Sequence, residues 1–162
     1  MDVEWLSDEE RAAWVRLIAL VELLPGALDG QLRRDAGLSN FEYFVLAMLS
    51  EAPDRVLRMT DLAARTNATL PRLSHVVSRL EDRGLVERRP CPGDRRATNA
   101  RLTDVGWRTL ADAAPGHVQH VRQNVIDALT PEQVGQLAGI AEAILGRLDP
   151  EGKVTARSPA RR

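Results

Sequence analysis

The chain has 162 residues, of which 44% are hydrophobic and 28% are charged, and its formal net charge is −1. This composition is typical of one globular domain with a substantial core, and it excludes a chain dominated by disorder. No stretch approaches the roughly 18 consecutive apolar residues of a transmembrane helix, and we expect no secretory signal in the acidic N-terminal stretch. A single cysteine excludes an intramolecular disulfide, so we expect a cytoplasmic protein with no membrane partner.

Charge is distributed unevenly along the chain. Residues 1–53 contain ten acidic residues and four arginines, whereas residues 54–108 contain 12 arginines and seven acidic residues. The middle of the chain is therefore basic, at +5, and the segment before it is acidic. This asymmetry predicts a surface that binds a polyanion and is held by a neutral or acidic scaffold.

The first predicted elements are two helices. Ser7–Glu10 has the Ser-x-x-Glu form of a capping box and opens a long helix with apolar residues at helical spacing. Pro25 is expected to kink or break this helix, and Gly37 is expected to end it in a left-handed conformation. A second capping box, Ser39–Glu42, predicts the next helix, which continues to about Ser50.

A helix-turn-helix is predicted next. Residues 56–60 indicate a short strand, and Thr60 is expected to cap a brief helix. After a tight turn, Thr69 is expected to cap a second helix, which has Pro71 in its first turn and ends at Gly84. A short helix, a tight turn and a second helix together form a helix-turn-helix.

A β-hairpin is predicted directly after this unit, in the position of a wing. Residues 85–90 and 99–103 are expected to be its strands, around a loop over Cys91–Arg96. Five arginines crowd this segment, namely Arg88, Arg89, Arg95, Arg96 and Arg101. Because like charges at this density repel one another, something outside the fold is expected to receive them.

Two more helices are predicted after the hairpin. Thr103 is expected to cap the first, which Pro115 interrupts, and Thr130–Gln133 is expected to cap the second, which ends near Leu148. Residues 149–162 have no apolar stripe, and we expect a disordered basic tail there. The predicted fold class is therefore mainly α, with six helices and a small β-wing.

The second helix of the helix-turn-helix is the candidate DNA reader. One face of its helical wheel is apolar and is expected to dock on the domain: Leu70, Leu73, Val76, Val77 and Leu80. The opposite face has short polar side chains, flanked by arginines that can reach guanine or phosphate. The residues predicted to contact the major groove are Thr69, Arg72, Ser74, His75, Ser78 and Arg79. An ordinary amphipathic surface helix has a similar polar face, and the arginine-rich hairpin favours DNA.

The segments "RLEDRGLVERR" (79–89) and "GDRRATNARLTDVG" (93–106) resemble the winged helix-turn-helix of the MarR family of bacterial transcriptional regulators. The family's Asp-x-Arg wing and Leu-Thr-x-x-Gly carry the match, and looser similarity covers about residues 7–148. The resemblance implies that Asp94 and Arg96 pair or brace the wing, while Arg95 or Arg96 enters the minor groove. A narrow minor groove concentrates negative potential, which agrees with this assignment.

For the other wing arginines, the residues leave alternatives open. Arg88 and Arg89 are expected at the base of the hairpin, where phosphates or nearby acids neutralise them. Arg101 is either a further DNA contact or only a solvated residue of the returning strand. Cys91 lies among cationic neighbours, which favour a reactive thiolate, so it is either a redox sensor or an incidental turn residue.

The resemblance also implies a homodimer held by the N- and C-terminal helices. Their apolar stripes are larger than one helix-turn-helix needs, although a self-contained monomeric bundle is an alternative. We expect a dimerisation helix in residues 1–38, a DNA-binding lobe in 39–105 and two dimerisation helices in 106–148. Two lobes on a two-fold axis would bind a pseudo-palindromic operator whose half-sites lie about one helical turn apart.

Members of this family often bind small aromatic or phenolic anions between the dimer helices and the DNA-binding lobe. By position, Trp14, Arg16, Phe44 and His117 are the predicted ligand-binding residues, although aromatic residues on an apolar stripe more often belong to the core. Such an effector would release DNA by changing the spacing of the two recognition helices.

Enzyme chemistry is not indicated by the sequence. It has no Gly-rich phosphate loop, no G-x-S-x-G and no H-E-x-x-H. His117 and His120 have no acid or thiol at ligand spacing, so neither a metal nor a cofactor is expected. We therefore predict a homodimeric repressor of transcription that binds double-stranded DNA. The alternative is a winged-helix scaffold or a nonspecific architectural DNA binder.

Overall fold

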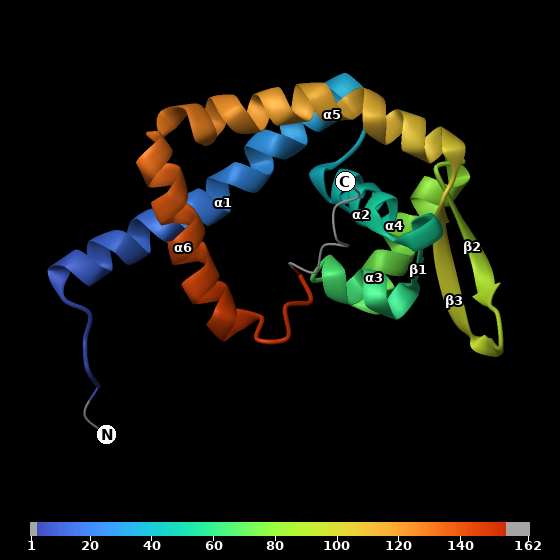
Figure 1. Ribbon diagram of the computed structural model, residues 1–162, viewed down its shortest axis with the longest axis horizontal. Coiled ribbons are helices and arrows are strands. Elements are labelled where there is room, and N and C mark those ends of the chain that lie inside the picture. Colours follow the sequence, from blue (N-terminus) through green and yellow to red (C-terminus); the bar gives the residue numbers. More distant parts are fainter. Residues whose placement is uncertain (1–2, 155–162) are drawn as a thin grey trace.

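The computed structural model describes residues 3–154, which form six α-helices and a small antiparallel sheet (Figure 1). The helices are α1 (Asp8–Ala36), α2 (Asn40–Glu51), α3 (Met59–Arg65), α4 (Leu70–Asp82), α5 (Asp104–Asn124) and α6 (Pro131–Leu148), with 3-10 turns at Pro53–Arg55 and Ile126–Ala128. The strands are β1 (Val56–Arg58), β2 (Val86–Cys91) and β3 (Asp94–Leu102), in the order β1-β3-β2. The predicted fold class is confirmed.

The predicted helix ends are mostly confirmed. Ser7, Ser39 and Thr130 each accept a hydrogen bond from the backbone N–H of the third helical residue, and that residue's side chain accepts one in return. Gly37 ends α1 in the left-handed region at φ 64°, where a residue without Cβ is unstrained. Thr69 caps α4, so the start of the recognition helix was predictable from local chemistry.

The two internal prolines do not break their helices, so the predicted interruption at Pro115 is wrong, and at Pro25 the break is excluded from the predicted kink or break. Helix α1 continues through Pro25, and α5 continues through Pro115. Each proline removes one bond of the helical ladder, but α1 and α5 also contact each other. His120 Nε2 lies 3.2 Å from the carbonyl oxygen of Ala27. We attribute the continuity of both helices to this tertiary support, which no local pattern reports.

Two boundaries near the sheet also differ from prediction. Helix α3 begins at Met59 after Arg58, so Thr60 lies inside the first turn and is not the cap. The wing strands extend further than expected, because β2 reaches Cys91 and β3 already begins at Asp94. The turn between them contains only two residues, and Gly93 supplies the positive φ of 83° that such a tight turn requires.

The hydrophobic core lies in the lobe formed by α2, α3, α4 and the sheet. Helix α4 buries Leu73, Val76, Val77 and Leu80, as the helical wheel predicted. Leu70 was expected on the same face, but its side chain is 46% exposed. The reason is its place in the first turn, where it lines a surface groove.

The junction between the lobe and α5 is fixed by close backbone packing. The Thr103 hydroxyl caps α5 and also donates to the carbonyl oxygen of Gly84 at 2.7 Å. A Cβ on Gly106 would lie 2.0 Å from the Leu85 carbonyl oxygen, so only glycine fits without a shift of the backbone. This explains the Leu-Thr-x-x-Gly pattern in physical terms.

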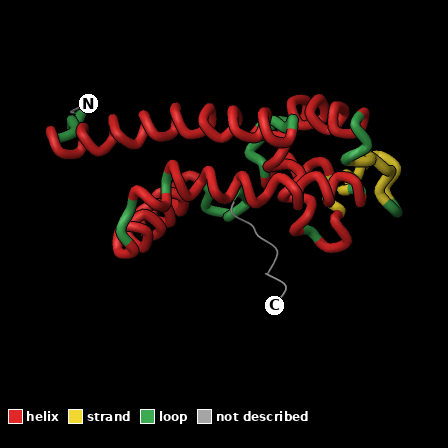
Figure 2. The backbone as a smooth tube through the Cα atoms, turned by 90° about the horizontal axis from the view of Figure 1, so that it is seen from above, coloured by secondary structure: helices red, strands yellow, loops and turns green. Residues whose placement is uncertain are grey.

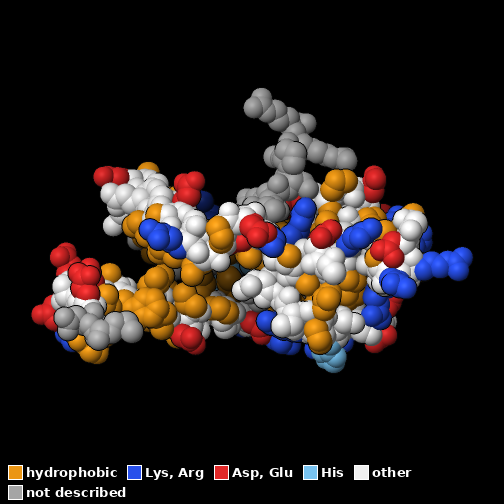
Figure 3. Space-filling view, turned by 90° about the horizontal axis from the view of Figure 1, so that it is seen from below, with side chains coloured by type: hydrophobic (Ala, Val, Ile, Leu, Met, Phe, Trp, Pro, Cys, Tyr) orange, Lys and Arg blue, Asp and Glu red, His pale blue; other side chains and the backbone are white. Residues whose placement is uncertain are grey.

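Helix α1 forms one arm that extends away from the sheet, and α5 together with α6 forms the other. Helices α1 and α6 overlap in Figure 1 but are separated in Figure 2. Helix α6 buries none of its residues, and α1 buries only Gln31 and Leu32. Large apolar side chains are instead exposed on both, including Trp14, Leu17, Ile18, Val21, Leu137, Ile140 and Ile144. Figure 3 shows that hydrophobic side chains gather at the end of the molecule opposite the wing.

Candidate nucleic-acid interface

The polar face of α4 is exposed to solvent. Thr69, Arg72 and His75 are exposed, while Ser74 and Ser78 are partly buried on the side that faces the wing. The side chains at the start of the helix are therefore free to approach a ligand that lies across its N-terminal half. This is the part of a recognition helix that contacts base edges.

The two arginines that flank this face are held by α2. The Arg72 guanidinium stacks on the ring of Phe41, 4.3 Å from its centroid. Arg79 forms an ion pair with Glu42, whose side chain is only 5% exposed. Burial raises the pKa of Glu42, but the hydrogen bonds from Arg79 and from the Ser39 N–H outweigh it, so this pKa lies below its ordinary value. Both arginines therefore help to dock α4.

Arg88 connects the wing to the recognition helix. Its side chain pairs with Glu81 on α4 at 2.8 Å, and its backbone N–H donates to the same carboxylate at 2.9 Å. The backbone and side-chain bonds from Arg88 hold the pKa of Glu81 below its ordinary value. The guanidinium also approaches the Ser74 and Ser78 hydroxyls at 3.5 and 3.4 Å. Arg88 thus fixes the wing against the face of α4 that is expected to bind DNA.

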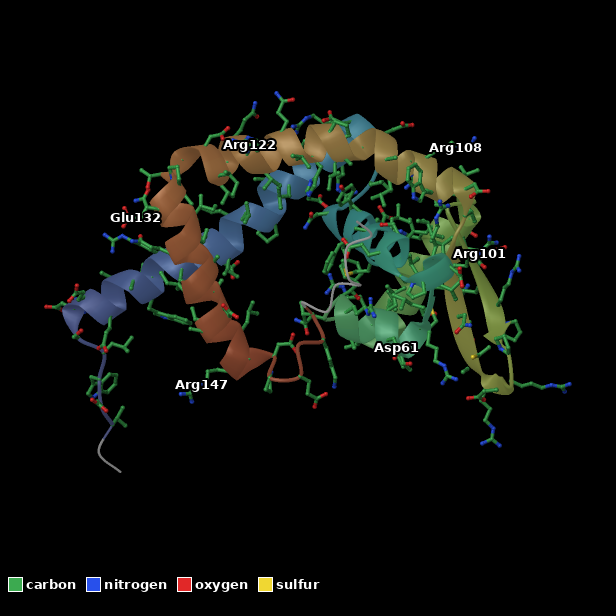
Figure 4. The ribbon with its side chains drawn as sticks, viewed as in Figure 1. Asp61, Arg101, Arg108, Arg122, Glu132 and Arg147 are labelled. Carbon is green, nitrogen blue, oxygen red and sulfur yellow. The ribbon has the colours of Figure 1, made fainter. Side chains whose placement is uncertain are left out.

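Two further wing arginines share one carboxylate within the fold. Glu87 pairs with Arg101 at 2.7 Å and with Arg89 at 2.9 Å, and these bonds lower the pKa of its carboxyl. Figure 4 shows Arg101 on strand β3 of the wing. Arg88 and Arg89 therefore have acidic partners, one of the two kinds of partner expected for them. Arg101, which was expected either to contact DNA or to be solvated, also has an acidic partner.

The tip of the wing carries the remaining two arginines. Arg95 and Arg96 are exposed, and neither forms an ion pair with any residue in the described range 3–154. The Asp94 carboxylate accepts a hydrogen bond from the Arg96 backbone N–H at 3.0 Å, so it braces the turn and leaves the guanidinium free. Cys91 is half-buried next to this turn, with its Sγ 3.7 Å from the Pro92 carbonyl oxygen.

A groove of about 400 Å³ separates α4 from the wing. Residues from the end of β1, the starts of α3 and α4, and both wing strands line it. Its polar lining consists of three arginines and three hydroxyl side chains, Arg58, Arg88, Arg96, Thr60, Ser74 and Thr98, without a carboxylate. Figure 3 shows that blue Lys and Arg side chains gather at this end of the molecule.

The four predicted ligand-binding residues do not form one site within a single chain. Phe44 packs against the lobe core, and the His117 ring contacts Tyr43 with a centroid distance of 4.4 Å. Trp14 lies roughly 20 Å along α1 from Ala27, the residue next to α5, at about 1.5 Å of rise per residue. Arg16 lies near Trp14 on the outer arm and donates to the Ala12 carbonyl oxygen at 2.9 Å.

Sequence reasoning missed several residues of this surface. Phe41 and Glu42 were assigned to helix packing and capping, because their partners on α4 are distant in sequence. Arg58 and Thr98 were not singled out at all. Only the density of arginines in residues 54–108 pointed toward Arg58, and that signal does not show which arginines have acidic partners.

Comparisons with known proteins agree with this geometry. The MarR family model matches residues 36–97. The crystal structure of Sco3205, a MarR family transcriptional regulator from Streptomyces coelicolor in complex with DNA, is 46% identical, with a TM-score of 0.88 and coverage of 92% of this chain and 93% of that one. AbsC, another MarR family regulator from Streptomyces coelicolor, is 38% identical with a TM-score of 0.84, covering 90% and 98%.

The chain belongs to the MarR family. The transcriptional repressor MprA of Escherichia coli is a more distant relative, 26% identical over 70% of this chain and 64% of MprA. The HTH-type transcriptional repressor YetL of Bacillus subtilis is 33% identical over 52% of this chain and 51% of YetL. The matched part thus spans half to two thirds of the length of these curated relatives. The four proteins named here are described as transcriptional regulators or repressors.

Two further features, a membrane-spanning helix and a cluster of metal ligands, are absent from the part of the chain that the structure describes. None of the helices in residues 3–154 is long and apolar enough to cross a membrane. Nor does that range contain a group of three or more histidine, cysteine or acidic residues placed to hold a metal ion.

Proposed function

We propose that this MarR family protein binds double-stranded DNA at a pseudo-palindromic operator and represses transcription there. Helix α4 would enter the major groove through Thr69, Arg72, Ser74, His75, Ser78 and Arg79, and the wing would enter the minor groove through Arg95 and Arg96. Asp94 would hold the wing turn in shape.

One observation carries this proposal. The wing places two exposed arginines without acidic partners at its tip, while each of its other three arginines is paired with Glu81 or Glu87. Internal ion pairs therefore fix the wing, and the arginines without an ion pair lie at the tip, where a narrow minor groove would attract them.

We propose further that the protein acts as a homodimer through α1, α5 and α6. The support is the apolar surface of α1 and α6, which covers several turns of both helices and which a soluble monomer would leave in water. A two-fold axis between the arms would place one lobe on each half of a palindrome.

Release of DNA by a small aromatic or phenolic effector remains a prediction. Because Trp14 and Arg16 lie far from Phe44 and His117 within one chain, a site with all four residues would need residues from both chains of a dimer. Such a ligand would act only if it bound one spacing of the two lobes more tightly than the other.

The proposal is tested by selection from random double-stranded DNA, followed by titration of the enriched sequence over a series of salt concentrations. We expect a palindrome with half-sites about one turn apart and an affinity that falls steeply with salt. Weak binding without an enriched sequence would instead support an architectural DNA binder. No binding at low salt would support a protein-interaction scaffold.

A further inference from the structure

The groove between α4 and the wing has a lining of which the sequence assigned only Ser74, Arg88 and Arg96 to possible DNA contacts. Its floor includes apolar residues, among them Met59 and Leu70, and its polar lining is cationic or hydroxyl-bearing. Leu70 is 46% exposed there, although it opens a helix whose other leucines are fully buried. An exposed leucine beside arginines indicates a ligand with both apolar and anionic parts.

The sugar–phosphate backbone of DNA has this combination. Its phosphate oxygens accept hydrogen bonds from guanidinium and hydroxyl groups, and about half or more of protein–DNA hydrogen bonds are of this kind. The deoxyribose carbons lie between successive phosphates of the strand and offer an apolar surface. The lining of the groove thus matches a nucleic-acid strand better than a free inorganic anion, which has no apolar part.

The position of the groove leads to the same ligand. In B-DNA a single sugar–phosphate strand separates the major groove from the adjacent minor groove. A protein with α4 in one groove and the wing in the other must accommodate that strand between them. We propose that the groove holds this strand, with Arg58 as its principal phosphate contact. This inference rests on the proposed function.

Arg58 is suited to this role by its surroundings. The backbone of Arg58 is held in the sheet opposite Asn99, while its side chain is exposed and has no ion pair among residues 3–154. Arg88 also lines the groove, but Glu81 balances its charge. Arg96, the third arginine of the lining, also has no ion pair in this range, but the proposed function places it in the minor groove. Arg58 is therefore the arginine without an ion pair that is left for the strand. Thr60 and Thr98 supply hydroxyl donors to the same strand.

The test compares Arg58→Ala, Arg58→Lys and wild type on the selected operator, by fluorescence anisotropy at several salt concentrations. Arg108→Ala is the matched control, because Arg108 is exposed on α5 and points away from α3 and the wing (Figure 4). We expect Arg58→Ala to reduce the slope of log K against log salt by about 1.8, which is about 0.9 for the one phosphate contact in each of the two half-sites. Arg58→Lys should retain the slope, and Arg108→Ala should change nothing.

A second measurement locates the phosphate. Single phosphates of the operator are replaced by neutral methylphosphonates, and wild type should lose affinity at one position in each half-site. Arg58→Ala should lose no additional affinity when the phosphate at that position is replaced by a methylphosphonate. Circular dichroism and thermal unfolding establish that the variant is folded.

The outcomes separate this inference from the proposed function. An enriched operator bound by Arg58→Ala with the wild-type slope would overturn the inference and leave the regulator intact. If Arg58→Ala instead lost affinity only for operators with one particular base pair, Arg58 would be a base contact, and the inference would also be overturned. Binding without sequence preference, but with the slope reduced by Arg58→Ala, would support the groove and overturn the operator.

Discussion

The lobe and the arms of this protein use apolar side chains in opposite ways. In the lobe, leucines and valines of α2, α3, α4 and the sheet are almost completely buried within one chain. In the arms, α6 buries no residue and much of α1 exposes its apolar side chains. The apolar side chains of the lobe are therefore covered within one chain, whereas those of the arms are left exposed for the second copy that we propose.

The same contrast applies to charge. Three arginines of the wing are paired with acids on the same chain. The two at the tip and Arg58 in the groove have no ion pair among residues 3–154. Burial and ion pairing thus distinguish the residues that build the lobe from those left for a partner. Composition alone would have assigned all of them to DNA binding.

The largest effect should come from the lobe core. Leu80 is fully buried on α4, so Leu80→Ala should lower the free energy of unfolding by about 2–5 kcal/mol. Chemical denaturation monitored by circular dichroism measures this. Leu148→Ala removes the same atoms from a side chain that is 76% exposed, and it should cost far less. Equal losses would contradict the distinction between the two regions.

In the arms, a charge should separate chains without unfolding the lobe. Ile140 is 59% exposed on α6, and Ile140→Glu should weaken dimerisation by about 2 kcal/mol or more, or roughly thirtyfold. Sedimentation equilibrium measures the change, and circular dichroism should show unchanged helicity in the lobe. Gly146→Glu adds the same charge six residues further on, at an exposed position on a different face of α6 with open space around it, and serves as the control. A fully dimeric Ile140→Glu variant would show that this face is not the interface.

At the wing, affinity should depend on which arginine is removed. Arg96→Ala should cost about 1–3 kcal/mol of operator affinity if its guanidinium enters a groove. Arg89→Ala is the comparison, because Glu87 already balances Arg89, and its loss should be below about 1 kcal/mol. Titration at fixed salt distinguishes them. The idea that ion pairing selects the DNA contacts fails if Arg89 proves the more important of the two.

The smallest effect concerns the link between α2 and α4 and depends on pH. The pKa of Glu42 is below its ordinary value of 4.5 in the fold. Its stabilising effect is therefore present above that pH and is lost as the pH falls toward the lower, folded value. Glu42→Gln should cost about 1–2 kcal/mol at pH 7, because solvent screens the half-exposed Arg79. It should also flatten the acid side of the stability profile, and an unchanged profile would argue against the ion pair.

Local patterns were sufficient to predict much of this fold. Capping boxes at Ser7, Ser39 and Thr130 gave the helix starts, and hydrophobic periodicity gave the buried face of α4, because both depend on residues within one or two turns. The prediction for Leu70 was wrong, since the first turn of α4 faces a groove that other elements complete. Neither Pro25 nor Pro115 breaks its helix, since α1 and α5 support each other. These effects come from contacts between distant segments.

The candidate site divides in the same manner. The arginine-rich hairpin and the exposed polar face of α4 could be predicted, because charge density and helical phase are visible in a sequence. The pairing of Arg79 with Glu42 could not, and neither could the groove around Arg58. Both depend on how α2, β1 and the wing pack around α4.

The most direct test of the account is sedimentation equilibrium of the protein alone and with its selected operator. The account predicts a mass of two chains for the free protein and two chains on one palindromic duplex. One chain per duplex, or a monomer at all concentrations that retains helical α1 and α6, would contradict the claim that the arms are completed by a second copy.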